Sequence, residues 1–415
     1  MIIAIILALA LWQQPAQTDS LSLRQCYELA RVNHPAREQL TLDKQSTQLR
    51  QESISHKNYP QVSMSGSATY QNEVTTVPNA PFSISKDQYK LNLQVDQNLF
   101  DGGAAREAHK VTAAKEHLND AQVNVQLYGV HNEVNQAFFS VLLARTSQNV
   151  LDLKRQVLEK RLAMVRSQVK NGMVLPGTEA ALQAELLTTD QQITSVKADQ
   201  EAAINTLTEV IGQKIDTTTK LSLPFDTTSF VPGNQIDRPE LNLFAANQTV
   251  LDREMDQTKV MNIPKLSAFA QGMYGRPGLN IFKDKFETNY MIGVRLTWKI
   301  WDWQEAKRQK SLLSVQKKMV NTQQNTFLRG VHIGMQRDMA NITKYHKLMT
   351  QDQRIIELRK QVESQSASQL RNGTITPSNY LEVLNQVYQA QLSREQHRLQ
   401  WIYAIVQYKT QTGTL

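Results

Sequence analysis

Few side chains in this sequence have the types and the spacing that catalysis or metal binding requires. The eight His show no metal-ligand spacing, the single Cys26 cannot form a disulfide within the chain, and no HExxH, phosphate-binding loop or GxSxG motif occurs. The sequence therefore predicts no enzyme, no cofactor and no metal site. Two of the His, His131 and His332, nevertheless recur in the tripeptide Gly-Val-His, 201 residues apart.

The repeated His131 and His332 could bind a metal ion or respond to pH if several copies met in an assembly. Each follows two residues after a Gly, Gly129 or Gly330. A Gly lets a neighbouring helix approach closely, because it has no side chain to keep the backbones apart. We therefore favour helix packing for this segment over a binding site.

The tripeptides belong to a longer internal repeat. The segment "SQVKNGMVLPGTEAAL" begins at Ser167 and "SQLRNGTITPSNYLEV" begins at Ser368, again 201 residues apart. Further upstream the offset is 204, because Tyr59-Pro60 matches Ile263-Pro264. The chain is therefore predicted to be a tandem duplication. Its predicted parts are a first structural repeat at 17–220, a linker at 221–236 and a second structural repeat at 237–415.

The chain opens with "MIIAIILALALWQQPAQ", an apolar run followed by polar residues. This length is typical of a secretory signal peptide, so residues 1–16 are predicted to be cleaved off near Ala16; a buried N-terminal helix is the alternative. No other segment approaches the ~18 consecutive apolar residues of a membrane-spanning helix. Any insertion into a membrane would therefore have to use β-strands.

Two long helices are predicted, one in each repeat. Residues 102–170 contain no proline and are rich in Ala, Gln, Leu, Glu and Lys, which predicts a helix of roughly 100 Å at 1.5 Å per residue. A helix of this length is typical of coiled-coil packing, and the Leu and Val of its second half follow a heptad seam. The matching helix of the second repeat is predicted from about residue 304 to 371.

The segments Asn-Gly to Pro are predicted to be tight reversals between helices. Gly172 and Gly373 supply the left-handed position that ends a helix, and Pro176 and Pro377 fit the first turn of the next one. The returning helices are predicted at about 178–211 and 378–410.

Four segments alternate apolar with polar side chains, the pattern of a β-strand with one apolar face. They have about the length of tilted membrane-crossing strands, and aromatic side chains lie at their ends, as at membrane interfaces. Phe269 and Met273 interrupt the alternation. A soluble sheet packed on one face is the alternative, but Asp96, Arg295 and Lys299 disfavour it, because no amphipathic helix is in view to cover the opposite side. The four segments are 61–71, 89–96, 266–274 and 290–301.

Four strands are too few to close a barrel. Only a closed barrel satisfies the backbone of lipid-exposed strands, and about eight strands are the minimum. If the strands cross a membrane, several protomers must share one barrel, and three protomers would supply twelve strands. The same three chains would contribute six long and six returning helices to a coiled-coil tube.

This order of elements, written twice behind a signal segment, resembles the TolC-like outer membrane efflux proteins. The resemblance covers essentially the whole mature chain. It is most specific in "LARVNHPA" with its echo "DRPELNLF", in "LFDGG", and in the two reversals "KNGMVLPG" and "RNGTITPSNYLEVLNQ". It implies a mainly α-helical fold with a membrane β-barrel. Long antiparallel coiled-coil helices would form a periplasmic α-barrel, and four strands per protomer would enter a shared 12-stranded barrel.

The resemblance also implies a location and partners. The protein is expected as a homotrimer in the outer membrane lipid of a Gram-negative bacterium, extending into the periplasm. There it would meet a periplasmic adaptor, also called a membrane fusion protein, which is fed by an inner-membrane pump of the RND or ABC type. The net charge of +8 is spread along the helices among acidic residues, so no nucleic-acid partner is predicted.

Site residues carry over by position. Asn171, Gly172, Asn372 and Gly373 are implied to form the tips that dock the adaptor. The acidic constriction of the family falls at Asn379 and Glu382, and this sequence departs from the family at the first position, which is neutral. A ring of three Glu382 side chains would favour cations, with weaker cation block than two acidic rings would give. A solvent-exposed helix face without a gating role is the alternative for Glu382.

The predicted function is therefore a passive exit duct in a tripartite efflux or type I secretion system. The alternative is a structural coiled-coil protein at the surface or in the periplasm, without transport. The paired alternating strands favour the duct, because a filament needs no lipid-facing β-surface. The transported substrate and the identity of the pump and adaptor do not follow from the sequence.

Overall fold

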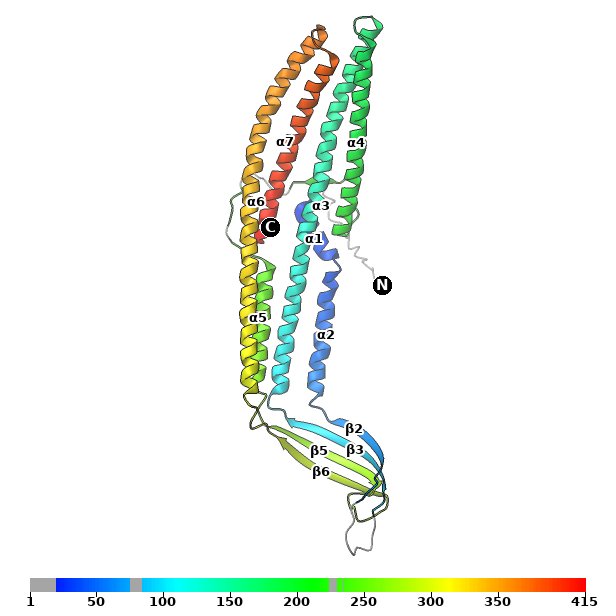
Figure 1. Cartoon of the computed structure of the whole chain (residues 1–415), viewed down its shortest axis with the longest axis vertical. Helices are drawn as coiled ribbons and strands as arrows, with labels where there is room; N and C mark the ends of the chain where they lie inside the picture. Colours follow the sequence, from blue (N-terminus) through cyan, green and yellow to red (C-terminus); the bar gives the residue numbers. More distant parts are fainter. Residues whose placement is uncertain (1–19, 75–83, 224–229, 234) are drawn as a thin grey trace, which may run out of the picture. The chain divides into compact units, whose positions relative to one another are not determined.

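The computed structural model describes residues 20–74, 84–223, 230–233 and 235–415 (Figure 1). The predicted signal segment 1–16 and part of the predicted linker 221–236 lie outside these residues. Two compact units make up the fold. The first contains Met1–Arg37, Val125–Pro239 and Phe327–Leu415, and the second contains Glu38–Asn124 and Glu240–Thr326.

Two helices of 67 residues each run through both units, α3 (Ala104–Lys170) and α6 (Glu305–Arg371). Each is followed by a helix of 36 residues, α4 (Pro176–Ile211) or α7 (Pro377–Thr412). The long and returning helices predicted from the sequence are confirmed, and their ends differ from the predicted ones by two residues at most. The order helix, two strands, long helix and returning helix occurs twice. The exact repeat boundaries stay a prediction.

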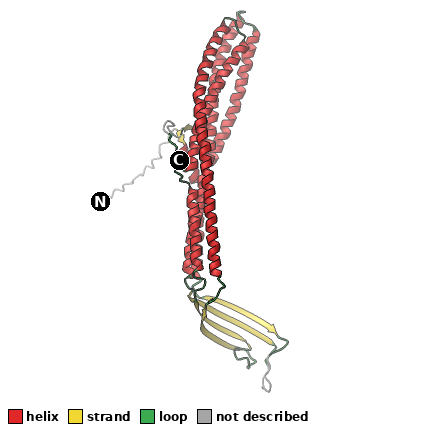
Figure 2. Ribbon diagram, turned by 60° about the vertical axis from the view of Figure 1, so that its left-hand side comes forward, coloured by secondary structure: helices red, strands yellow, loops and turns green. Residues whose placement is uncertain are grey.

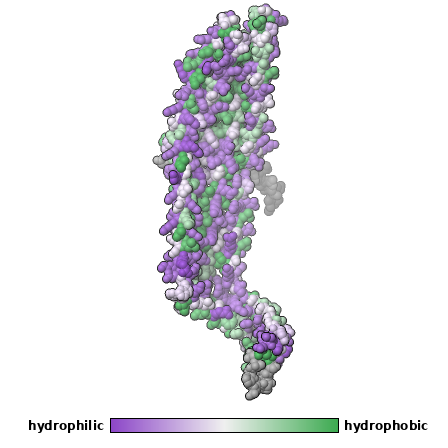
Figure 3. All heavy atoms as spheres, viewed as in Figure 1, coloured by the Kyte–Doolittle hydropathy of each residue, from purple (hydrophilic) through white to green (hydrophobic). Residues whose placement is uncertain are grey.

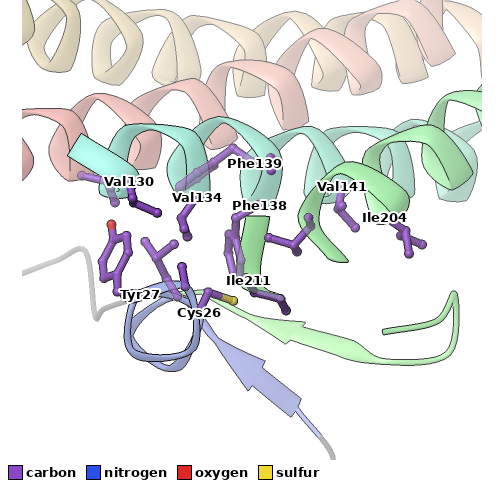
Figure 4. Packing of buried hydrophobic residues seen from close by; sticks show 14 of the residues in the cluster. Cys26, Tyr27, Val130, Val134, Phe138, Phe139, Val141, Ile204 and Ile211 are labelled. Carbon is purple, nitrogen blue, oxygen red and sulfur yellow. The ribbon is translucent and has the colours of Figure 1, made fainter. Parts of the chain in front are cut away.

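The first unit holds an apolar core of 15 buried residues. The short helix α1 (Leu23–Asn33) packs there against α3 and α4. The strand β1 (Ser20–Ser22) directly precedes α1 and pairs in parallel with β4 (Lys220–Ser222). Figure 4 shows Cys26 and Tyr27 of α1 facing side chains of α3 and α4. Phe138, Val134 and Cys26 are 0% exposed. Burial raises the pKa of the Cys26 thiol to about 12, so this Cys is an inert core residue.

Local sequence explains where α1 begins. The Ser22 hydroxyl accepts a hydrogen bond from the Gln25 backbone N–H at 3.3 Å, and the Gln25 side chain accepts one from the Ser22 backbone N–H at 2.8 Å. This reciprocal capping box satisfies two backbone donors that the first helical turn leaves unpaired. It fixes the helix that carries Cys26 and Tyr27 into the core.

The second unit contains a four-stranded antiparallel sheet and the helices α2 (Ala36–His56) and α5 (Pro239–Thr258), together with the first parts of α3 and α6. The strand order is β2-β3-β5-β6, so among the described residues β2 and β6 each have one unpaired edge (Figure 2). All four predicted strands are confirmed. Their bounds are β2 Gln61–Tyr70, β3 Asp87–Phe100, β5 Lys265–Arg276 and β6 Glu287–Thr297.

The register gathers the apolar side chains of the sheet on one face. One row across the sheet is Val62, Val95, Ala270 and Ile292, since each pairs with the next. Side chains of this face are exposed within the chain: Val62 is 67%, Met64 68%, Ile292 75% and Val294 70% exposed. So large an exposed apolar face marks a surface that meets lipid or another protein.

The interruption of the alternation at Phe269 has a packing cause. Phe269 pairs with Gly293 across β5 and β6, and a Cβ on Gly293 would lie only 2.8 Å from the Phe269 ring. The Arg295 guanidinium lies 5.0 Å from the centre of the same ring. The aromatic side chain therefore fills the space above a glycine on the polar face, where Arg295 covers it.

None of the helices within the described residues combines the length and the apolar composition needed to cross a membrane.

Hydrophilic side chains predominate on the helical surface that Figure 3 shows. This agrees with helices that bury apolar stripes between one another and leave polar faces outward.

Candidate functional site

The two helical tips close with the same backbone turn. Gly172 has φ +67° and Gly373 has φ +71°, in the left-handed region that favours glycine. In the first tip the Met173 N–H donates to the Gln168 carbonyl at 2.9 Å, and in the second tip Thr374 N–H donates to Gln369 at 2.9 Å. Both are the six-to-one hydrogen bond of a Schellman motif, which satisfies carbonyls at the helix end. The turns predicted from Asn-Gly to Pro are confirmed.

The surfaces of the two tips differ. Met173 and Leu175 are 65% and 78% exposed at the first tip. The second tip has Thr374 and Thr376 at the equivalent positions, both exposed. A Cβ on either tip glycine would meet no atom within 4 Å, so both tips are open surfaces. The first tip therefore offers an apolar surface and the second a hydroxyl-rich one.

Asn379 and Glu382 lie one turn apart near the start of α7, and both are exposed. The Asn379 backbone N–H donates to the Thr376 hydroxyl at 3.2 Å, which caps the helix. Glu382 lines a groove of about 660 Å³ between α6 and α7, whereas Asn379 lies outside it. The structure thus separates the surroundings of the two residues that the sequence placed together at the constriction.

Two groove residues that the sequence did not single out connect to Glu382. The Gln386 amide donates to the Glu382 carboxylate at 3.4 Å, and the Arg359 guanidinium of α6 donates to the Gln386 side-chain oxygen. The Gln386 side chain therefore links the positively charged Arg359 of α6 to the Glu382 carboxylate of α7. No motif marks Arg359, because the contact depends on the rotation of α6 against α7.

A buried acid lies further along the same groove. Asp352 of α6 is 7% exposed and lines the groove, and its Oδ2 lies 2.6 Å from His397 Nδ1 of α7. The Tyr345 ring lies 6.1 Å from the His397 ring, between ring centres. Sequence reasoning missed this pair as well, since 45 residues separate its members.

Tyr380 fixes the start of α7 against both long helices. Its ring is 1% exposed, and its hydroxyl donates to Glu363 Oε1 of α6 at 2.8 Å. Arg161 of α3 lies 3.7 Å from the same carboxylate oxygen and 5.0 Å from the Tyr380 ring centre. Burial and the hydrogen bond to Glu363 raise the pKa of Tyr380. Because Tyr380 stands between Asn379 and Glu382, this contact sets the orientation of the predicted constriction.

The repeated His residues lie in opposite surroundings. His131 is packed between the rings of Tyr27 and Tyr128, at 4.4 Å and 4.6 Å between ring centres. Burial, and then the charges of Arg31 and Arg238, lower the pKa of His131 from 6.5 to about 4. His332 is exposed, with its Nδ1 2.7 Å from the Leu328 carbonyl.

The packing interpretation of the repeated glycines is wrong within this chain. A Cβ on Gly129 or Gly330 would meet no atom within 4 Å, so in the described part of the chain no neighbouring helix packs closely on either glycine. Within α6, Gly334 does have a close neighbour, because a Cβ there would lie 2.8 Å from the Gln411 side chain. Over the described ranges, no group of three or more His, Cys, Asp or Glu could hold a metal ion.

A family model described as "Outer membrane efflux protein" matches residues 26–213. No curated protein matches the chain. The fold agrees with solved structures over almost the full length. The outer membrane protein VceC from Vibrio cholerae has a TM-score of 0.68 at 13% identity, with 94% of this chain and 96% of that chain covered.

Two further structures are similar. The Campylobacter jejuni outer membrane channel CmeC has a TM-score of 0.66 at 15% identity, with 94% of this chain and 85% of that chain covered. The open state of the Neisseria gonorrhoeae outer membrane channel MtrE has a TM-score of 0.65 at 13% identity, with 94% and 88% covered. At these identities the structural likeness establishes the fold.

Proposed function

We propose that this chain is an outer membrane efflux protein, as the family model matching residues 26–213 suggests, and that it is the exit duct of a tripartite efflux or type I secretion system. Its place is the outer membrane of a Gram-negative bacterium, with the helices extending into the periplasm. The duct is a passive homotrimer through which substrates pass from a periplasmic adaptor to the exterior. An inner-membrane pump of the RND or ABC type supplies the energy.

The observation that carries this proposal is the unfinished sheet. Its four strands leave β2 and β6 unpaired at their outer edges, and one face exposes a continuous apolar surface. Unpaired edges in lipid are prohibitively unfavourable, so the sheet needs neighbours on both sides. Three chains joined edge to edge give twelve strands and leave no edge unpaired.

The tips are the proposed adaptor docking sites. Asn171 and Gly172 form one, and Asn372 and Gly373 form the other. Support comes from their open surroundings and from the Schellman turns, which hold the backbone in one conformation before a partner arrives. The apolar side chains Met173 and Leu175 would anchor the contact at the first tip.

The constriction is proposed at Glu382, with Asn379 contributing a neutral side chain. Three Glu382 carboxylates around a threefold axis would attract cations. The Arg359 to Gln386 chain tempers this attraction, because it brings a positive charge close to each carboxylate. The constriction is thus expected to select by charge only weakly.

The mass of the particle tests the assembly. Protein extracted with detergent from a fractionated outer membrane would be measured by size exclusion with light scattering, corrected for bound detergent. We expect three times the mass of the mature chain, recovered only with detergent. A monomer or dimer released into the soluble periplasm would contradict the duct and leave the coiled-coil scaffold.

A further inference from the structure

Each repeat joins its second strand to its long helix through a turn, and the two turns have the same backbone. In the first repeat, Asp101 accepts a hydrogen bond from the Ala105 N–H at 2.6 Å. In the second, Asp302 accepts one from the Ala306 N–H at 3.1 Å. Both acids lie at the start of a long helix, 201 residues apart, and complete its first turn.

The residues after these acids differ sharply. Gly102 and Gly103 have φ +71° and +86°, and the equivalent Trp303 and Gln304 have φ +52° and +60°. A bulky side chain rarely adopts positive φ, because its Cβ meets the backbone. Strained backbone of this kind persists only where the surrounding structure holds it, and it clusters at functional sites. Trp303 is also 76% exposed, so its role is not in the core of its own chain.

The first turn shows what such a turn contacts. Gly102 lies against Ile263, at the turn that leads into β5, so closely that a Cβ on Gly102 would come within 2.9 Å of the Ile263 Cβ. Just beyond, Phe100 pairs with Leu266 where β3 meets β5. The turn of the first repeat therefore packs on the turn before the first strand of the second repeat.

Among the described residues, no other turn packs on the second turn in this way; the Trp303 ring meets the ring of Trp301, two residues away, at 5.8 Å between ring centres. Its strand β6 is an edge of the sheet, and β2 is the opposite edge. The turn before β2 contains Tyr59, which is equivalent to Ile263 by the offset of 204 and is 59% exposed. The turns at Trp303 and Tyr59 are thus equivalent to the two turns that meet at Gly102 and Ile263, but within the described chain they do not meet each other.

The repeat reproduces this junction in detail. The Gln97 amide donates to the Asn58 carbonyl at 2.6 Å in the first repeat. The equivalent Trp298 indole N–H donates to the equivalent Asn262 carbonyl at 3.1 Å in the second. Since both turns are built alike, the internal junction is a valid template for the open one.

We propose that Trp303 packs against the turn at Tyr59 of a second copy of this chain, so that β6 of one protomer joins β2 of the next. This deepens the proposed function and rests on it, because a shared barrel needs three such junctions. In the internal junction the two turns approach closely because Gly102, which has no side chain, lies against the aliphatic side chain of Ile263. The junction between protomers instead places two aromatic side chains together, which adds apolar area where no covalent connection holds the strands.

The test is a disulfide between protomers. Tyr59→Cys combined with Trp303→Cys is oxidised in the full chain, boiled in SDS so that non-covalent trimers dissociate, and separated without reductant. The native Cys26 can stay, because it is buried and its thiol is unreactive. We expect loss of the monomer band into dimer and trimer bands. Each single variant should remain monomeric, as should Tyr59→Cys combined with Ile292→Cys, whose β6 position is 75% exposed but lies away from the turn.

Light scattering separates the two possible failures. A trimeric mass with no more cross-linking than the mismatched pair gives would overturn this junction and leave the duct intact. A monomeric mass would overturn the duct, and the junction with it.

A second variant needs no cysteine. Trp303→Gly restores the residue of the first repeat and relieves the strain, so the chain should fold. We expect its trimer to dissociate at a lower temperature in SDS than the wild-type trimer. Gln304→Gly relieves strain at the next residue without removing an aromatic ring and should not lower that temperature. Equal temperatures for Trp303→Gly and wild type would overturn the junction.

Lipid is the other possible neighbour of Trp303, since exposed Trp side chains are frequent at membrane interfaces. A fluorophore on Trp303→Cys in vesicles with brominated phosphatidylcholine distinguishes the two. Packing against the next protomer predicts little quenching relative to the same label at Ile292→Cys. Equal quenching at both positions would overturn the protein contact.

Discussion

The hairpin of α3 with α4 and the hairpin of α6 with α7 have the same lengths and the same reversal, yet different side chains in equivalent places. Gly172 and Gly373 adopt nearly the same φ, whereas His131 is half-buried and His332 is exposed. The groove with Glu382 belongs to the second hairpin. The two repeats have therefore kept the residues that fix the backbone, while the side chains that fill a core or line a groove have diverged.

The largest expected difference between the hairpins lies in their cores. Phe138 of α3 is 0% exposed and equivalent to Met339 of α6, which is 37% exposed. We expect Phe138→Ala to lower the free energy of unfolding by about 3 to 5 kcal/mol, because it leaves a cavity. Met339→Ala should lower it by less than about 1 kcal/mol. Urea unfolding, monitored by circular dichroism, measures both changes. Equal losses of unfolding free energy would contradict the difference between the two cores.

The next effect concerns pH and His131. Burial lowers its pKa from 6.5 to about 4, so the unfolded chain takes up this proton before the folded chain does. The stability that neutral His131 contributes is fully present above pH 6.5 and is lost as the pH falls toward 4. The full loss is on the order of 3 kcal/mol. Urea unfolding at several pH values measures it.

Two variants isolate that titration. Along the described chain, His131 Nδ1 has no hydrogen-bond partner, so His131→Phe leaves no polar group unpaired. This variant should lose stability less steeply than wild type between pH 6.5 and 4. His332→Phe should keep the wild-type slope, because His332 is exposed. A wild-type slope in His131→Phe would assign the acid sensitivity to other groups.

The sequence predicted the elements well and their side-chain surroundings poorly, for a physical reason. Helix ends depend on local chemistry, so Gly172 and Pro176 located the reversal to within two residues. Contacts between elements depend on how helices rotate against one another, which a single helical pattern does not reveal. Tyr27 beside His131 and Arg359 near Glu382 are of this kind. The interpretation of Gly129 failed similarly, because a glycine's sequence position does not show whether a neighbour is present.

Two glycines separate the effect of backbone conformation on stability from the effect of side-chain packing. Gly172 has positive φ, so Gly172→Ala should lower the free energy of unfolding by about 1 to 2 kcal/mol. Gly129 lies inside α3 with open space around its Cβ position, so Gly129→Ala should raise it by about 0.5 to 1 kcal/mol. Urea unfolding measures both changes. A loss at Gly129→Ala would indicate a neighbour supplied by another protomer.

The smallest expected effect is at the proposed constriction. Glu382→Gln should lower the ratio of potassium to chloride permeability by about twofold, roughly 0.5 kcal/mol, because exposed charges in water interact weakly. Reversal potentials across a planar bilayer with a salt gradient measure this ratio. Glu382→Asp keeps the charge and should keep the ratio. An unchanged permeability ratio in Glu382→Gln would contradict the proposal that Glu382 forms the constriction.

The most direct test of the central claim, that this chain forms a duct, is the conductance of the purified wild-type trimer in the same planar bilayer. We predict discrete current steps of one size, each from one inserted trimer, with a weak preference for cations. A trimer that inserts and carries no current at any applied voltage would contradict the duct.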